Sequence, residues 1–475
     1  MGRGGRFAAR MTGFGWLVLA LALASGCATT SLFTPYPFQA AEIKAKLSQG
    51  KFDQAIASLD KFRHSKDKTL YMLEQGRVAQ VAGRYPKSME AFDIAIAEEA
   101  QADLKAKISL SKMAASGSSL LTNDNAIPYR AAAYERILMY NYQALNYLAL
   151  GKLEGAGVEV RRAALEQRDA LERHHKELAR LDEQAREQRR LVARNQDQVA
   201  ARFRQMREAV AGLKNAFQSA YTFYISGVIY ELLGEPNDAY IDYKKAYEIY
   251  PDNPYLQADL LRLSAQLGFD EDHERFSRLF SPPRGAQEGR ELILLYEEGF
   301  VPPKQQVFID FYTPHGIQAV AFPFYSDVSS PPRPLSLSTG EDEPLGRTAL
   351  ITDVQALAVK DLAEKLPAIT LRQVLRLVAK YQLQKQAEDN LGSLGAAAAM
   401  IYNVMSESAD LRSWLTLPSK VHVLRVHLPV GMKQVKLNVP GYHLARMVTL
   451  DETRPGPAIL HVVALQGRMV VRQLW

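Results

Sequence analysis

The sequence predicts a mainly α-helical protein in which a solenoid of helix hairpins is followed by a smaller α+β domain. Three observations support this fold class. A pattern of small and large apolar residues recurs within residues 37–280, a charged stretch free of glycine and proline interrupts it at residues 161–210, and short β-rich runs begin at residue 291. The proline- and glycine-rich residues 281–290 form a linker between the two parts.

The clearest copy of the recurring pattern occupies residues 223–251. Small residues stand where the two helices of a hairpin would cross closely, large apolar residues surround them, a glycine opens the turn, and a proline ends the second helix. These positions are Phe223, Gly227, Tyr230, Gly234, Ala239, Tyr243, Ala246 and Pro251. The spacing resembles that of the tetratricopeptide repeat (TPR) family, which implies a curved α-solenoid whose concave face binds another protein.

Further copies of the pattern precede this one. The same pattern fits the sequence when its turn glycine is aligned with Gly83, and again when it is aligned with Gly151. A weaker copy surrounds Gly50. Residues 255–280 suit a terminal pair of capping helices. Because one hairpin cannot bury its own apolar face, the four copies are expected to stack on one another.

Residues 161–210 are dense in charged and amide side chains, most of which are strong helix formers. An apolar residue recurs every seven positions, as in a half-complete coiled-coil seam, at Leu171, Leu178, Ala185, Val192, Val199 and Met206. A single helix would reach about 75 Å, and a hairpin turning near Asn195 about half that length. Either form is expected to project from the solenoid, as a solvated extension or as an arm that binds a partner.

Residues 291–475 contain two groups of expected strands on either side of a group of expected helices. The helices are expected at residues 353–366, 370–385 and 394–406. The strands are expected at residues 292–296, 306–312, 317–322, 421–428, 434–439, 459–465 and 469–474. This order predicts one α+β domain, a small β-sandwich with a helical insertion.

The N-terminus resembles a bacterial lipoprotein signal. Three arginines precede the apolar residues 14–23, and small residues then lead to Cys27, the only cysteine of the chain. A transmembrane anchor is disfavoured because a bilayer requires roughly 20 apolar residues. An ordinary secretory signal is the other alternative, and it would leave the position of Cys27 unexplained. We therefore expect a signal peptide at residues 1–26 and a lipid-anchored linker at residues 27–36.

This resemblance implies that the protein is anchored in a membrane by lipid. Cys27 would carry two acyl chains through a glyceryl group on its sulfur and one chain, such as palmitate, on its amine, and three chains anchor a protein firmly. Ala28 rather than aspartate follows the cysteine, which by the same resemblance favours the outer membrane, facing the periplasm. With Cys27 acylated, no thiol is left for a disulfide or a zinc site.

Two runs extend the resemblance to a family of uncharacterised Gram-negative lipoproteins with TPR-like repeats. These runs are S-S-L-L-T-N-D-N-A-I-P-Y-R-A-A-A-Y-E at residues 118–135 and L-R-S-W-L-T-L-P at residues 411–418. Members of this family are often encoded near outer-membrane regulators of peptidoglycan synthases. The resemblance implies a part in cell-envelope assembly or in the regulation of peptidoglycan synthesis.

Two features could contribute to a binding site. The polar loop before the third repeat has two interpretations, helix capping or a polar pocket at the edge of the groove; the pocket would be formed by Asn123, Asp124, Asn125, Tyr129, Arg130 and Glu135. Trp414 would either fill the bottom of the β-domain or be exposed for stacking on a ligand.

No motif for a catalytic nucleophile, a metal site or a phosphate-binding loop occurs in the sequence, so neither enzymatic activity nor a cofactor is predicted. The net charge is +6, and +3 without the three arginines of the signal, which is too small to indicate nucleic-acid binding. The leading hypothesis is a periplasmic scaffold or adaptor for a protein partner. The alternatives are a module that binds peptidoglycan or another glycan, and an envelope hydrolase with an unrecognised site.

Overall fold

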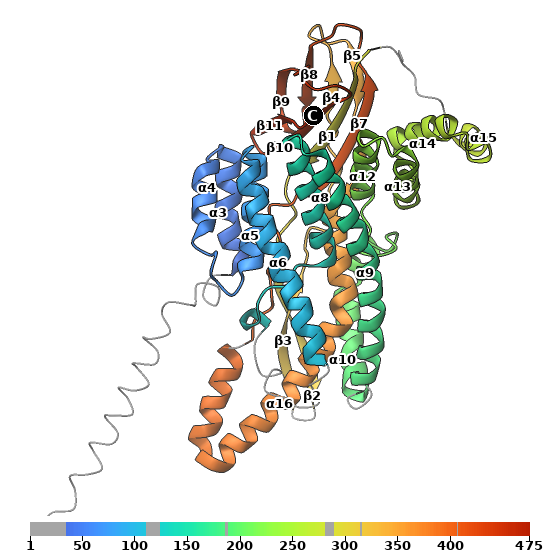
Figure 1. Cartoon of the computed structure of the whole chain (residues 1–475). Helices are drawn as coiled ribbons and strands as arrows, with labels where there is room; N and C mark the ends of the chain where they lie inside the picture. The colour runs from blue at the N-terminus through green and yellow to red at the C-terminus, as the bar shows by residue number, and fades with distance from the viewer. Residues whose placement is uncertain (1–34, 111–123, 186–188, 281–288, 314–315, 406) are drawn as a thin grey trace, which may run out of the picture.

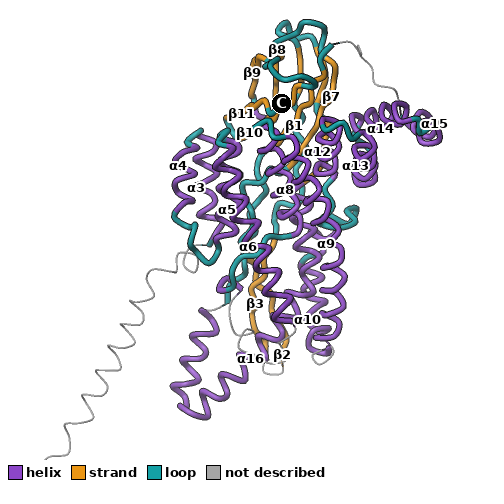
Figure 2. The backbone as a smooth tube through the Cα atoms, viewed as in Figure 1, coloured by secondary structure: helices purple, strands orange, loops and turns teal. Residues whose placement is uncertain are grey.

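A computed structural model gives the structure of the chain. It describes residues 35–110, 124–185, 189–280, 289–313, 316–405 and 407–475. The expected signal peptide and Cys27 lie outside these ranges. Helix hairpins stack side by side, and a β-rich part lies against them (Figures 1 and 2). Within the described ranges, no helix combines the length and apolar character needed to cross a bilayer.

Five helix hairpins form the solenoid, each in contact with the next. Their helices are α3 (Tyr36–Gln49) and α4 (Phe52–Asp60), α5 (Lys68–Val81) and α6 (Tyr85–Leu110), α8 (Ala133–Ala149) and α9 (Leu153–Ala185), α12 (Ala220–Leu232) and α13 (Pro236–Ile249), and α14 (Pro254–Leu267) and α15 (Asp270–Leu279). The turn of each hairpin contains a glycine in the left-handed conformation, with φ between 66° and 77°, at Gly50, Gly83, Gly151, Gly234 and Gly268. The four predicted turn glycines are therefore confirmed, and residues 255–280 form a fifth hairpin.

The two helices of a hairpin cross closely at a helical glycine. A Cβ atom added to Gly227 would lie 2.4 Å from Tyr243, and one added to Gly76 would lie 2.5 Å from Phe92. Tyr243 and Phe92 are fully buried. The small and large positions of the repeat pattern therefore meet as predicted.

Replacing Gly227 with alanine is expected to lower the free energy of unfolding by about 1–3 kcal/mol, the usual cost of overpacking a filled core. Elsewhere in a helix this substitution would stabilise the protein, because alanine is the better helix former. Gly212→Ala is the control, since no heavy atom lies within 4 Å of the added Cβ. Urea unfolding of both variants measures the difference, and equal midpoints would show that the helices do not cross at Gly227.

The β-rich part contains two facing sheets and a separate hairpin. The order is β11-β10-β1-β7-β6 in the first sheet and β5-β4-β8-β9 in the second, while β2 and β3 pair with each other as a two-stranded sheet. The strands are β1 (Glu291–Glu298), β2 (Gln305–Thr313), β3 (Gly316–Phe324), β4 (Ser336–Ser338), β5 (Pro344–Arg347), β6 (Ala349–Asp353), β7 (Lys420–His427), β8 (Gln434–Val439), β9 (Leu444–Thr449), β10 (Ala458–Leu465) and β11 (Arg468–Gln473). The predicted α+β fold of this part is confirmed.

Strand β1 contributes to two cores because its side chains alternate between the faces of the sheet. Leu292 and Leu294 belong to the core between the two sheets. Ile293 and Leu295 face the other way and join the core shared with the helices. The five-stranded sheet is thus buried on both faces, by the second sheet on one side and by the solenoid on the other.

The helical insertion is one helix, α16 (Val354–Met405), rather than the three helices expected. Pro367 lies inside it without ending it. Contacts of α16 with α8, α9, α10 and β3 account for the difference, because tertiary packing overrides local breaking signals.

The charged stretch at residues 161–210 also differs from expectation. It contains the end of α9, then α10 (Arg189–Arg202) and α11 (Arg204–Ala209). Asn195 is buried in the middle of α10, where its side chain accepts a hydrogen bond from Tyr312 N at 2.7 Å and donates one to Tyr312 O at 3.2 Å. Helix α10 contacts β2 and α16, so it is part of the body of the protein and not a projecting arm.

Candidate functional site: the inner face of the helical array

The first helix of each hairpin contacts the C-terminal half of the chain; we call α3, α5, α8, α12 and α14 the inner helices. Lys44 of α3 donates to Val301 O at 2.9 Å, and Arg77 of α5 pairs with Glu297 of β1. Tyr221 N of α12 donates to Thr352 Oγ1 at 2.9 Å. Asn253 at the start of α14 donates to Leu350 O at 2.9 Å.

The chain therefore fills the inner face of its own solenoid. The sequence predicted a concave face open to a protein partner, and this expectation is wrong for the part in contact with residues 290–475. The second, outer helices of the hairpins lie farther from the two sheets (Figure 1), and one of them, α9, also contacts α16.

Two buried carboxylates hold the segment at residues 410–416 against the inner helices. Glu74 of α5 accepts hydrogen bonds from Leu415 N at 2.8 Å, Thr416 N at 3.1 Å and the Tyr36 hydroxyl at 2.5 Å. Glu135 of α8 accepts one from Trp414 N at 2.7 Å. Burial raises the pKa of both carboxyls, and these hydrogen bonds oppose the shift.

Trp414 is fully buried between two hairpins. Its ring lies 5.8 Å from that of Phe92 and 5.9 Å from that of Tyr142, centroid to centroid, and both contacts are edge-on. The indole nitrogen donates to Thr416 Oγ1 at 3.1 Å. Trp414 fills a core, as one interpretation predicted, but that core belongs to α6 and α8; it offers no surface for stacking on a ligand.

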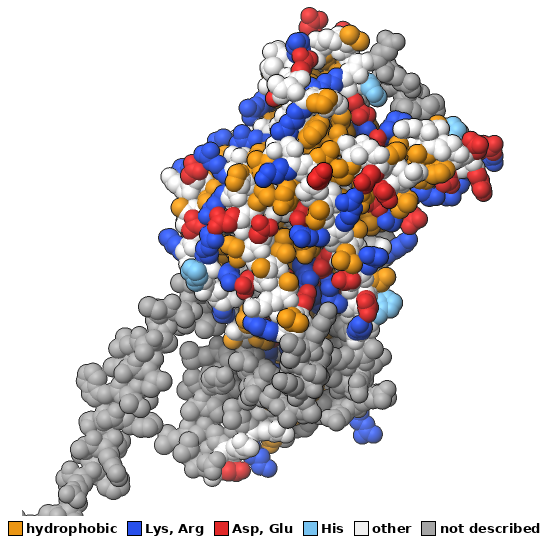
Figure 3. All heavy atoms as spheres, viewed as in Figure 1, with side chains coloured by type: hydrophobic (Ala, Val, Ile, Leu, Met, Phe, Trp, Pro, Cys, Tyr) orange, Lys and Arg blue, Asp and Glu red, His pale blue; other side chains and the backbone are white. Residues whose placement is uncertain are grey.

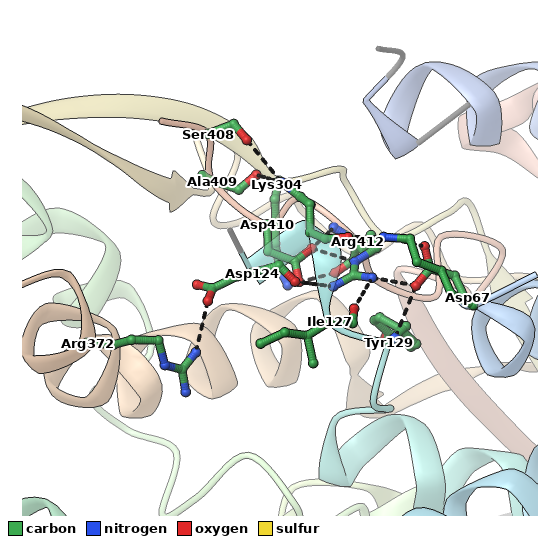
Figure 4. A network of polar contacts seen from close by, with 12 residues as sticks. Asp67, Asp124, Ile127, Tyr129, Lys304, Arg372, Ser408, Ala409, Asp410 and Arg412 are labelled. Carbon is green, nitrogen blue, oxygen red and sulfur yellow. Dashed lines mark hydrogen bonds and ion pairs between the residues drawn. The ribbon is translucent and has the colours of Figure 1, made fainter. Parts of the chain in front are cut away.

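Arg412 is the centre of a polar network that joins the loop before α8 to the same segment (Figure 4). Its guanidinium donates to Asp67 at 2.5 Å, Asp410 at 2.7 Å, Ile127 O at 2.9 Å and Asp124 O at 3.0 Å. The side chain is only 5 % exposed. The network ties the chain to itself, and its charges are already paired.

The residues predicted to form a polar pocket are divided among three places. Asp124 pairs with Arg376 of α16 at 2.8 Å, and Asn125 donates to Ala409 O at 3.2 Å. The Tyr129 hydroxyl donates to Glu135, which also accepts from Ala132 N at the start of α8. This helix cap was not among the residues for which capping was predicted. Asn123 lies outside the described residues.

Arg130 stands apart from the other predicted pocket residues and lines a cavity of about 230 Å³. Arg130 pairs with Glu99 at 3.1 Å, and the neighbouring Arg136 pairs with Asp103 at 2.8 Å and Glu166 at 2.9 Å. These ion pairs compensate the charges of the cavity wall.

Three arginines that sequence reasoning missed bind the ends of successive inner helices. Arg468 donates to Gln49 O at 3.0 Å at the end of α3, Arg472 to Ala82 O at 2.9 Å after α5, and Arg454 to Ala149 O at 3.2 Å at the end of α8. Cations are favourable there because the last carbonyls of a helix lack partners and carry partial negative charge. Arg468 and Arg472 share one face of β11, four residues apart, and this spacing is the signal in the sequence.

Arg425 of β7 forms a buried ion cluster with the last two hairpins. It lies 2.7 Å from Glu231 of α12, 3.0 Å from Asp259 of α14 and 2.7 Å from Glu291 of β1. Burial alone would raise the pKa of Glu231, but Arg425 and Arg262 outweigh it and lower this pKa to about 2.

The lowered pKa of Glu231 makes stability depend on pH. An unfolded glutamate titrates near 4.3, so the stabilisation by Glu231 is complete above that pH and is lost as the pH falls toward 2. Between about pH 6 and pH 3, the wild type is expected to lose more stability than Glu231→Gln, which has no carboxyl at this position. Urea midpoints at the two pH values measure this, and equal losses would contradict the assigned ion cluster.

Comparisons with known proteins add little to this geometry. No family model matches the chain, and no curated protein matches it in sequence. A crystal structure of MamA aligns over 49 % of this chain and 89 % of its own, with 12 % identity and a TM-score of 0.28. The TPR2AB domain of yeast Sti1, in a complex with pHSP90, aligns over 50 % and 88 %, with 15 % identity and a TM-score of 0.20. The TPR-like character of the array is therefore argued from its own turn glycines and close helix crossings.

Proposed function

We propose that this protein is a non-catalytic scaffold for protein–protein interactions, held at the outer membrane by lipid on Cys27 and facing the periplasm. Its role would be in cell-envelope assembly or in the regulation of peptidoglycan synthesis. The observation that supports a scaffold best is the array of five TPR-like hairpins, an architecture that presents extended helical surfaces to partners. Because the chain itself covers the inner helices, the partner would bind the outer helices.

Exposed apolar side chains on the outer helices suit this role. Val158 and Leu165 of α9 are 45 % and 47 % exposed, and Ile241 of α13 is 49 % exposed. Val158 and Leu165 are seven residues apart and so share one face of α9. Arg161, between them, pairs with Glu235 at the start of α13 at 3.1 Å, which brings the start of α13 close to α9.

Site-specific photo-crosslinking in living cells, followed by mass spectrometry, tests the scaffold. A photoreactive residue at Leu165 or Ile241 is expected to form an adduct with the same periplasmic or envelope protein. Met447 of β9 is the matched control, because it is 46 % exposed but lies outside the helical array. No reproducible adduct from the outer helices, or an adduct from Met447 alone, would contradict the proposal.

Replacing Cys27 with alanine is expected to release the protein from washed membranes into the soluble periplasmic fraction, since the acyl chains anchor it. Ala28→Asp is the matched control: by resemblance to lipoprotein sorting, this variant stays lipidated but moves to the inner membrane. Membrane fractionation and the mass of the N-terminal peptide measure both outcomes. A Cys27→Ala protein that remains in washed membranes would exclude the lipid anchor.

A further inference from the structure

One exposed surface combines arginines with apolar side chains and lies apart from the residues of α9 and α13 proposed to bind a protein partner. It consists of Arg190, Arg194 and Arg202 on α10 and of Phe308, Tyr312 and Ile317 on the β2–β3 hairpin; we call it the arginine–hairpin surface. All six residues are exposed, Phe308 by 55 % and Ile317 by 60 %. Helix α10 and strand β2 are in direct contact.

The helical side of this surface has an excess of positive charge. Residues 189–208 contain six arginines but only Asp197 and Glu208 as acids. Within the part of the chain that the structure describes, none of the exposed arginines of this stretch forms an ion pair: Arg190, Arg194, Arg202, Arg204 and Arg207. Figure 3 shows a different pattern on the upper part of the face in view, where cationic and acidic side chains are interspersed.

The arginines are held beside the hairpin by its aromatic rings. The Arg194 guanidinium lies 4.8 Å from the centre of the Tyr312 ring, on the exposed face of the hairpin. The Arg202 guanidinium lies 5.6 Å from the centre of the Phe324 ring, which belongs to the face of Ile309 and Phe311. Arg190 precedes Arg194 by one helical turn and therefore lies on the same side of α10. A cation over an aromatic face keeps its hydrogen-bond donors free for an anion.

The hairpin side of the surface is mainly apolar because of its strand register. Tyr312 stands opposite Ile317 in the ladder, and Phe308 is four residues before Tyr312, so all three side chains share one face. Ile309 and Phe311 point to the other face and are buried in the main core. Burying one face of the hairpin therefore leaves Phe308, Tyr312 and Ile317 at the surface, together with one exposed carboxylate, Asp310, between Phe308 and Tyr312.

We propose that the arginine–hairpin surface binds the anionic headgroups of a lipid bilayer, with Phe308 and Ile317 entering the interfacial layer. Guanidinium groups next to exposed aromatic and aliphatic side chains are the combination found in proteins that lie on anionic membranes. The proposal rests on the proposed function, because the bilayer concerned is the one that anchors Cys27.

The position of the surface suits that bilayer. Helix α3 begins, and the β2–β3 hairpin ends, toward the lower side of the molecule in Figures 1 and 2. The residues between Cys27 and Tyr36 are few enough that they span at most about 30 Å. The anchor therefore keeps the membrane near the start of α3, on the side to which the hairpin points.

Vesicle sedimentation with the Cys27→Ala protein released into the periplasm, which carries neither the acyl chains nor residues 1–26, tests the surface without the anchor. The protein is expected to sediment with vesicles containing phosphatidylglycerol and to remain in the supernatant with vesicles of phosphatidylcholine alone. Since one arginine near an anionic surface strengthens binding about fivefold, the triple variant R190Q/R194Q/R202Q is expected to bind about a hundredfold more weakly.

The control K51Q/R84Q/K152Q removes three charges at the opposite ends of the helix hairpins, from exposed residues that each follow a turn glycine. It is expected to bind like the parent protein. The double variant F308S/I317S is expected to bind severalfold more weakly, because it removes the inserted apolar groups. All the substituted side chains are exposed, so the variants are expected to fold. Circular dichroism verifies that each of them is folded.

Equal sedimentation of the arginine variant and its control would overturn the proposal. Retention of the protein on heparin without sedimentation with anionic vesicles would also overturn it, and would identify a polyanionic macromolecule as the partner. These outcomes are independent of the scaffold and of the anchor. Photo-crosslinking at Leu165 and Ile241 tests the scaffold, and fractionation of Cys27→Ala cells tests the anchor.

Discussion

Replacing Arg425 with methionine is expected to lower the free energy of unfolding by about 3–5 kcal/mol, the range observed when one partner of a buried ion pair is removed. The change would leave Glu231, Asp259 and Glu291 close together without the cation that neutralises them. The large effect arises because the remaining carboxylates are buried, where an unpaired charge is costly.

Lys433→Met is the control for this prediction. Lys433 also pairs with a carboxylate, Glu452 at 2.8 Å, but that pair is exposed to solvent and contributes little. Urea unfolding measured by circular dichroism is expected to separate the two variants clearly. Similar midpoints for both would show that Arg425 does not join the sheet to the last two hairpins.

Replacing Glu74 with alanine is expected to lower the free energy of unfolding by a similar amount, about 3–5 kcal/mol. The change leaves the backbone N–H groups of Leu415 and Thr416 buried without an acceptor, and each such group costs about 1–3 kcal/mol. The Tyr36 hydroxyl also loses its acceptor. Glu74→Gln should cost less, because its amide oxygen still accepts one of these hydrogen bonds.

Glu90→Ala is the matched control for Glu74→Ala. Glu90 lies on α6, in the same hairpin as Glu74, and pairs with Arg63. It is exposed, and the hydrogen bond that it accepts from Arg63 is also at the surface. Its removal is expected to leave the urea midpoint nearly unchanged. If Glu74→Ala were as stable as Glu90→Ala, the segment at residues 410–416 would not be held by α5.

Much of the solenoid could be predicted because its determinants are local. The turn glycines Gly83, Gly151 and Gly234 and the crossing pair Gly227 and Tyr243 lie within one hairpin, so their spacing appears directly in the sequence. The alternation of apolar residues likewise predicted most strands of the two sheets.

The occupied inner face could not be predicted because its contacts join distant parts of the chain. Arg77 and Glu297 are 220 residues apart, and Trp414 lies far in sequence from Phe92. The sequence does contain a hint of this arrangement. Glu74, Arg77 and Gln80 follow one another at three-residue spacing on α5, and all three are buried. A row of polar side chains on the inner side of a hairpin is the feature that indicates polar partners from elsewhere in the chain.

The polar loop shows why a pocket and an internal contact are hard to distinguish from sequence. Asp124 and Asn125 are residue types that suit a ligand site as well as a loop, and their partners Arg376 and Ala409 are known only from the fold. Asn195 is a second example. Asparagine is common in turns, but Asn195 is buried within α10, where it accepts a hydrogen bond from Tyr312 N of β2.

The C-terminal half of the chain covers the inner helices, and Trp414 reports on this contact directly. With Trp475 replaced by phenylalanine, Trp414 is the only tryptophan left after the expected removal of residues 1–26. Its fluorescence is expected to be that of a buried indole, to resist quenching by acrylamide, and to change in urea together with the helical circular dichroism. An emission typical of a solvent-exposed indole, or a fluorescence transition at lower urea while the helices persist, would show that the C-terminal half does not cover the inner helices.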